Sequence, residues 1–156
     1  MKASPSRAGE AYQAHFQRYP VIFVTFKEVK ATTWEQAWLA IQEKLRVLIG
    51  EHRYLVESDR VSQGDIARLA AILDGTADEV THQFSLLLLS RCLAQHHGRD
   101  VVVLIDEYDT PIHAGWLSGY GPQVLGFFRT FLNAGLKGNP HLFKAVVTGI
   151  LRVAKE

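Results

Sequence analysis

Three apolar stretches of the chain have the composition of β-strands. Residues 19–26 are rich in β-branched and aromatic side chains, and Pro20 stands near the start, where a strand tolerates proline. Residues 101–105 are five consecutive apolar residues, four of them β-branched. That composition predicts a strand buried on both faces, as in a parallel sheet. The third stretch, residues 142–151, contains a Thr-Gly pair towards its end.

Apolar residues at helical spacing lie between these stretches. Four helices are expected, over residues 32–50, 62–75, 77–95 and 123–136. The first opens with Thr-Thr-Trp-Glu at residues 32–35, which has the spacing of a capping box that begins at Thr32. Pro111 biases the chain away from a regular element, and the glycine-rich residues 113–121 are predicted to be a loop.

The order of these elements predicts an α/β fold, with a parallel sheet and flanking helices. Strand, helices, strand, helix and strand make up βαβ units joined by right-handed crossovers. Residues 1–10 are small and polar and are expected to form a loose N-terminal arm. The remaining residues, 11–156, start with a strand and stop a few residues after one, which suggests a partial domain cut at both ends.

Composition narrows the class of protein. A length of 156 residues suits one domain, and the formal charge of +1 gives no indication of a nucleic-acid binder. No signal peptide is visible, and no apolar run approaches the length of a membrane span. The single cysteine, Cys92, excludes an internal disulfide and fits the reducing cytoplasm, where we expect the protein. Its leucine-rich surroundings predict that Cys92 packs in a buried helix rather than acting as a nucleophile.

The candidate chemistry follows the middle strand directly. Asp106 and Glu107 come after the apolar run, at the carboxyl end where open α/β sheets place their ligands. Mg²⁺ takes one or two carboxylates together with phosphate oxygens and water, so Asp106 could hold the ion of a nucleotide site. Glu107 could orient and deprotonate the attacking water, and strand alternation would send the two side chains to opposite sides. The alternative is that both acids merely cap a loop.

Two further residues could contact phosphate. Thr148 stands near the tip of the third strand, where its hydroxyl could reach a γ-phosphate or the attacking water, although threonine is also an ordinary strand residue. Arg152 could be a phosphate-reaching cation or a solvated surface residue. A phosphatase of the haloacid type is disfavoured, because the second acid, Asp109, lies three residues after Asp106 rather than two.

The string Val-Val-Val-Leu-Ile-Asp-Glu-Tyr-Asp-Thr-Pro-Ile, at residues 101–112, resembles the Walker B region of the bacterial AAA-ATPase-like family. Residues 19–26 resemble the second strand of that family, and residues 143–156 its sensor strand and the following turn. The resemblance implies a P-loop NTPase-like domain that uses ATP and Mg²⁺. By matching positions, Asp106 would be the Mg²⁺-associated acid, Glu107 the base and Thr148 the sensor-like residue.

The family's glycine-rich loop with Gly-Lys-Ser is missing from the sequence. Without its amides and lysine nothing neutralises the phosphates, so we expect a central fragment that is inactive in isolation. Loss of the strand that carries this loop would leave residues 142–151 as an apolar edge that favours self-association. Two alternatives remain: a non-catalytic interaction module, and a phosphohydrolase without a P-loop that uses Asp106 and Asp109 with a metal.

Overall fold

The computed structural model describes residues 18–149 of the chain. The predicted N-terminal arm (residues 1–10) and Arg152 lie outside the described residues. The elements follow one another as β1 (Val21–Thr25), α2 (Trp34–Glu51), η1 (Arg53–Glu57), α3 (Gln63–Asp74), α4 (Glu79–Gln83), α5 (Ser85–His97), β2 (Val101–Asp106), α6 (Asp109–Ser118), α7 (Gly121–Leu132), the π-helical turn η2 (Asn133–Lys137) and β3 (Leu142–Val147).

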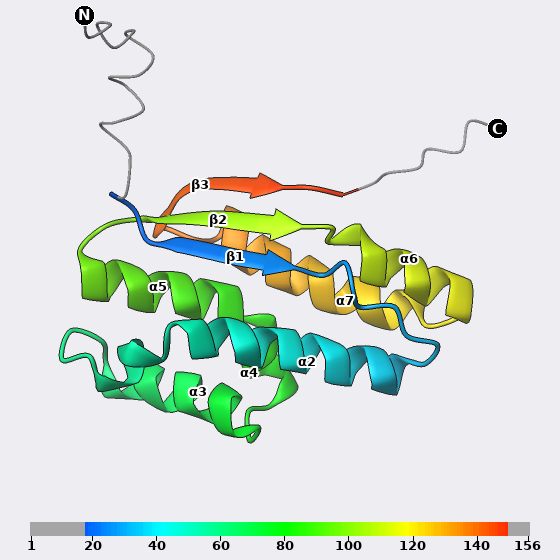
Figure 1. The fold of residues 1–156 in the computed structure, drawn as a ribbon, viewed down its shortest axis with the longest axis horizontal. Coiled ribbons are helices and arrows are strands. Elements are labelled where there is room, and N and C mark those ends of the chain that lie inside the picture. The colour runs from blue at the N-terminus through cyan, green and yellow to red at the C-terminus, as the bar shows by residue number, and fades with distance from the viewer. Residues whose placement is uncertain (1–17, 150–156) are drawn as a thin grey trace, which may run out of the picture.

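The three strands form a parallel sheet in the order β1-β2-β3, which confirms the predicted α/β fold. In this register Thr25 lies opposite Asp106, so that the ends of β1 and β2 are level. The helices pack on one side of the sheet, with α6 next to the carboxyl end of β2 (Figure 1). Right-handed crossovers that advance in one direction along a sheet place their helices on the same face, which accounts for this arrangement.

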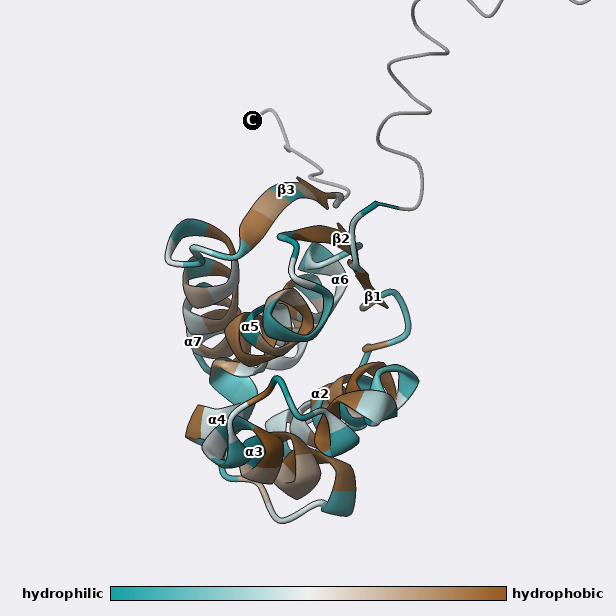
Figure 2. Cartoon of the chain, turned by 90° about the vertical axis from the view of Figure 1, so that its left-hand side faces the viewer, coloured by the Kyte–Doolittle hydropathy of each residue, from teal (hydrophilic) through white to brown (hydrophobic). Residues whose placement is uncertain are grey.

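Within residues 18–149 the helices cover one face of the sheet, and the prediction that residues 101–105 are buried on both faces is wrong. On β2, Val101, Val103 and Ile105 are buried against the helices, whereas Val102 and Leu104 on the other face are half-buried. β1 alternates in the same way between buried and exposed residues. Apolar colouring runs along the strands, although the helices lie on one side of the sheet only (Figure 2).

β3 is an edge strand among the described residues. It pairs with β2 on one side, and all of its residues after Leu142 are exposed. Phe143, Val146 and Val147 are large apolar side chains in contact with solvent. The exposed apolar edge expected from residues 142–151 is thus present over the described part of that stretch.

Several helix ends follow the predicted signals, whereas Gly50, predicted to end the first helix, lies within α2. Ser62 caps α3 by accepting a hydrogen bond from the Asp65 amide at 3.2 Å, and Gly75 and Gly98 end α3 and α5 in the left-handed conformation. The cap of α2 is Thr33 rather than Thr32, because the Thr33 hydroxyl accepts from the amide three residues later. The N-cap of this helix therefore lies one residue later than predicted.

Two helix predictions are wrong in extent. Residues 109–118 form α6, although a loop was expected over most of them. Pro111 falls in the first turn, where its missing amide hydrogen has no helical acceptor to lose, so the helix tolerates it. The helix predicted over residues 77–95 is divided at Phe84 into the short α4 and the longer α5.

One hydrophobic core lies between the sheet and the helices. It includes Phe26, Phe127, Phe128 and Phe131, which are all fully buried. Cys92 belongs to the same core, as predicted, and burial raises the pKa of its thiol to about 12. Among the residues that the structure describes, no helix combines the length and apolarity needed to cross a membrane.

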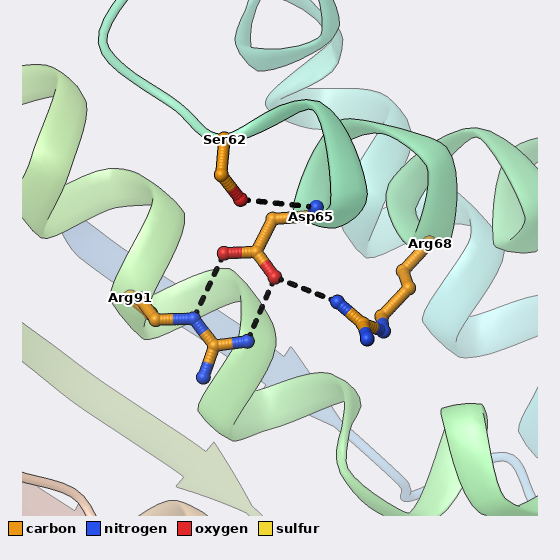
Figure 3. Close-up of polar contacts among 4 residues, drawn as sticks. All are labelled: Ser62, Asp65, Arg68 and Arg91. Atoms are coloured by element: carbon orange, nitrogen blue, oxygen red, sulfur yellow. Dashed lines mark hydrogen bonds and ion pairs between the residues drawn. The ribbon is translucent and has the colours of Figure 1, made fainter.

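A partly buried ion pair joins α3 to α5 (Figure 3). The Asp65 carboxylate accepts hydrogen bonds from Arg91 Nε and Nη2, both at 2.9 Å, and from Arg68 Nη1 at 3.1 Å. These bonds from Arg91 lower the pKa of the Asp65 carboxyl below its ordinary value. The cluster lies within the helical layer and fixes the two helices relative to each other.

Candidate functional site

The carboxyl ends of the three strands bring together Thr25, Asp106 and Thr148. Asp106 is the last residue of the central strand β2, and its two neighbours come from the strands on either side. The Thr25 hydroxyl donates to Asp106 Oδ2 at 3.1 Å, and the Thr148 hydroxyl donates to Asp106 Oδ1 at 2.7 Å. Each carboxylate oxygen is thus oriented by a hydroxyl from a different strand.

The backbone holds this arrangement in place. Thr148 donates its amide hydrogen to the carbonyl of Ile105 at 2.8 Å, so the chain still follows β2 just beyond β3. An ionised carboxylate offers about four acceptor positions, and the two hydroxyls occupy two of them. Asp106 therefore retains acceptor positions for a cation or for water.

Glu107 leaves the strand with an unusual backbone conformation. Its φ of 49° is the only positive value at a non-glycine residue among the described residues. This left-handed conformation costs a residue with a Cβ about 1–2 kcal/mol, and such outliers cluster at functional sites. The side chain accepts a hydrogen bond from the Thr110 hydroxyl at 3.3 Å. Because Glu107 is no longer extended, strand alternation does not determine its direction, which differs from the expectation.

Asp109 begins α6 and lies against Gly149. A Cβ built on Gly149 would stand 2.8 Å from both Cγ and Oδ1 of Asp109, closer than two such atoms can approach. A side chain at this position would therefore displace the Asp109 carboxyl group, and glycine lets the chain after β3 pass close to it. The Thr-Gly pair is visible in the sequence, but the contact of Gly149 with Asp109 depends on how β3 is positioned.

A groove of about 820 Å³ opens beside these acids. We call it the α6 groove. Residues 30–32 of the β1–α2 connection line it on one side, and Glu107 with the exposed side of α6 on the other. Asp109, Ile112, His113, Trp116 and Leu117 are among the α6 residues that face it. Glu107 thus connects the strand ends to a sizeable open space.

The oxygen atoms of Thr25, Asp106 and Thr148 at the strand ends could supply some of the ligands of a hard cation. Carboxylate, hydroxyl and water oxygens are the ligands that Mg²⁺ prefers, and Mg²⁺ sites commonly use only one or two carboxylates. Asp106 could hold such an ion, with the Thr25 and Thr148 hydroxyls beside it. Within residues 18–149 no group of three or more His, Cys, Asp or Glu side chains is placed to hold a metal.

Of the predicted site residues, the structure places Asp106 and Thr148 in direct contact and Glu107 next to them. Thr25 was missed. Its position at the end of the first predicted strand was visible in the sequence, but only the register shows that it faces Asp106.

Comparison with protein families gave one match. The model of a family described as "Predicted AAA-ATPase" matches residues 6–156 of the chain. The match includes every helix and strand described above and all of the candidate site residues. Comparisons with curated proteins and with solved structures gave no match.

Proposed function

The chain belongs to the family described as "Predicted AAA-ATPase", and from this premise we propose that it carries the metal and water half of an ATP-hydrolysing site. In this proposal β2 is the Walker B strand and β3 the sensor strand of a P-loop NTPase-like domain. Residues 11–156 form part of that domain. The ligands are ATP and Mg²⁺.

The observation that supports the proposal best is the position of Asp106. A single carboxylate stands at the carboxyl end of the central strand and is oriented by hydroxyls from both neighbouring strands. Open parallel sheets bind ligands at this end. The two hydroxyls orient the Asp106 carboxylate without neutralising its charge, and no basic side chain of the described residues pairs with it. Such a carboxylate is suited to binding a cation.

The other residues take roles that follow from their positions. Bound Mg²⁺ would neutralise negative charge that develops on the phosphates. Glu107 accepts a proton from the attacking water, and Thr110 orients its carboxylate. Thr148 is the sensor residue: its hydroxyl contacts the γ-phosphate when ATP is bound and donates to Asp106 when no phosphate is present. Arg152, outside the described residues, is proposed as a phosphate-facing cation.

Mn²⁺ provides a direct test, since it accepts the same oxygen ligands as Mg²⁺ and broadens nearby NMR signals. We expect substoichiometric Mn²⁺ to broaden the amide signals of Thr25, Asp106 and Thr148 in the 156-residue chain. Asp106→Asn should weaken this effect about tenfold or more. Asp100→Asn, at an exposed acid that precedes β2, is the matched control and should behave like the wild type. Equal broadening in the Asp106→Asn variant would contradict the proposal.

The phosphate half of the site is not among these residues. The sequence contains no Gly-x-x-x-x-Gly-Lys-Ser or Gly-x-x-x-x-Gly-Lys-Thr loop, and the proposed acids would repel an unneutralised triphosphate. We therefore expect the purified 156-residue chain to show no ATP turnover above background in a coupled phosphate-release assay. Turnover that Glu107→Gln abolishes would overturn this expectation.

We also propose that the apolar edge strand β3 supports self-association of the 156-residue chain. Edge strands are templates for strand pairing, and β3, the edge strand among the described residues, exposes apolar side chains to solvent. In sedimentation velocity, the average sedimentation coefficient should increase with the protein concentration. Val146→Lys should suppress this increase, whereas Val80→Lys on α4 should not; the two valines are 55% and 58% exposed. Equal suppression by both variants would place the interface elsewhere.

A further inference from the structure

Most of the residues that line the α6 groove, about 820 Å³ in volume, have no role in the proposed ATP chemistry. Glu107 and Thr110 are the exceptions. Trp116 and Leu117 are large apolar side chains on the wall of the groove, and both are exposed. An exposed aromatic and leucine beside a groove are typical of an interaction surface.

The walls of the groove are held firmly. The Tyr120 hydroxyl donates to the carbonyl of Ala31 at 2.7 Å, which ties the turn after α6 to the opposite wall. Trp116 packs over Gly121, where even a Cβ would collide with the indole ring. The groove is therefore formed before any ligand arrives, so that binding would cost little reorganisation.

The charge of the groove is predominantly negative. Glu107 and Asp109 lie towards the strand ends, and neither forms an ion pair within the described residues. Lys30, on the opposite wall, is the one lysine or arginine among the lining residues. Two carboxylates thus face one ammonium group, an arrangement that attracts a cation and repels phosphate-rich surfaces such as nucleic acids and anionic membranes.

We propose that the α6 groove binds an amphipathic helix of a partner protein. The helix would present a Lys or Arg to Glu107 and Asp109, and a large apolar side chain to Trp116 and Leu117. Asp109, Ile112 or His113, and Trp116 recur at three- or four-residue intervals and form one stripe along α6. From Asp109 to Trp116 this stripe spans two turns, about 10 Å, so cationic and apolar anchors seven residues apart on the partner helix would match it.

Occupation of the groove would also affect Glu107. A helix in the groove would cover the Glu107 carboxylate and keep the attacking water away from it, so the bound helix would restrain hydrolysis. This consequence rests on the proposed function, whereas docking itself depends only on the groove.

The test uses two synthetic peptides of fourteen residues that differ in the charge of their ionisable side chains, which is positive in one peptide and negative in the other. The first is a leucine and lysine helix in which a lysine and a leucine stand seven residues apart; in the second, glutamate replaces each lysine. Binding to the ¹⁵N-labelled 156-residue chain is followed by chemical-shift changes. We expect the lysine peptide to shift signals of α6 and residues 30–32, and to bind about tenfold more tightly than the glutamate peptide.

Variants separate the contributions. Leu117→Ala should weaken binding of the lysine peptide about tenfold, whereas Leu39→Ala on α2 should leave it unchanged; these leucines are 76% and 66% exposed. Asp109→Asn should also weaken binding. Asp106→Asn should not, so failure of docking is distinguishable from failure of the proposed metal site. Equal affinity for both peptides, shifts confined to β3, tighter binding of a single-stranded oligonucleotide, or no shift at millimolar peptide would overturn the proposal.

Discussion

Phe26→Ala is expected to lower the free energy of unfolding by about 4 kcal/mol, as truncation of a fully buried phenylalanine commonly does. The Phe26 ring contacts Phe128 and Phe131 edge-on, with centroids 4.9 and 6.1 Å apart. Its removal leaves a cavity between β1 and α7 and also loosens the chain next to Thr25. Urea denaturation followed by circular dichroism measures the change.

Phe23→Ala is the matched control, three residues earlier in the same stretch. Phe23 lies on the uncovered face of the sheet and is 54% exposed, so its truncation should cost less than about 1 kcal/mol. A cost for Phe23→Ala that equals the cost for Phe26→Ala would show that this face is covered in solution.

Phe26 is buried and Phe23 is exposed, although both lie in the same apolar stretch, and the sequence alone does not predict this difference. Strand positions and the caps at Ser62, Gly75 and Gly98 were predictable because they depend on local chemistry. Which face of the sheet is covered depends on where the crossovers lie. Both faces of β1 and β2 are apolar, so periodicity could not distinguish them.

The candidate site shows the same division. Asp106 and Glu107 were identifiable from the apolar run that precedes them, and Thr148 from its place near the end of the third strand. The pairing of Thr25 with Asp106 depends on register, and the left-handed backbone of Glu107 depends on the path into α6. The helix α6 was not predicted, because a proline commonly interrupts a helix. Pro111 lies in the first turn of α6, where a helix tolerates proline.

Asp65→Asn is expected to lower the free energy of unfolding at pH 7 by about 2–3 kcal/mol. The substitution removes the charge that accepts two hydrogen bonds from Arg91 and one from Arg68 (Figure 3). Asp65 is the buried acceptor that both arginines share, and hydrogen bonds to charged groups are worth more than neutral ones. Glu43→Gln, in an exposed pair with Arg46 on α2, is the control and should leave the free energy of unfolding almost unchanged.

The pH dependence distinguishes charge from packing at Asp65. Hydrogen bonds from Arg91 lower the pKa of this carboxyl in the folded chain, whereas the unfolded chain binds the proton at its ordinary pKa of about 4. The stabilisation is therefore fully present above about pH 4 and is lost as the pH falls through the folded pKa. In urea denaturation from pH 7 to pH 3, the difference between wild type and Asp65→Asn should shrink below about pH 4. A difference that stays constant over this range would mean that Asp65 stabilises α3 and α5 through packing rather than through its charge.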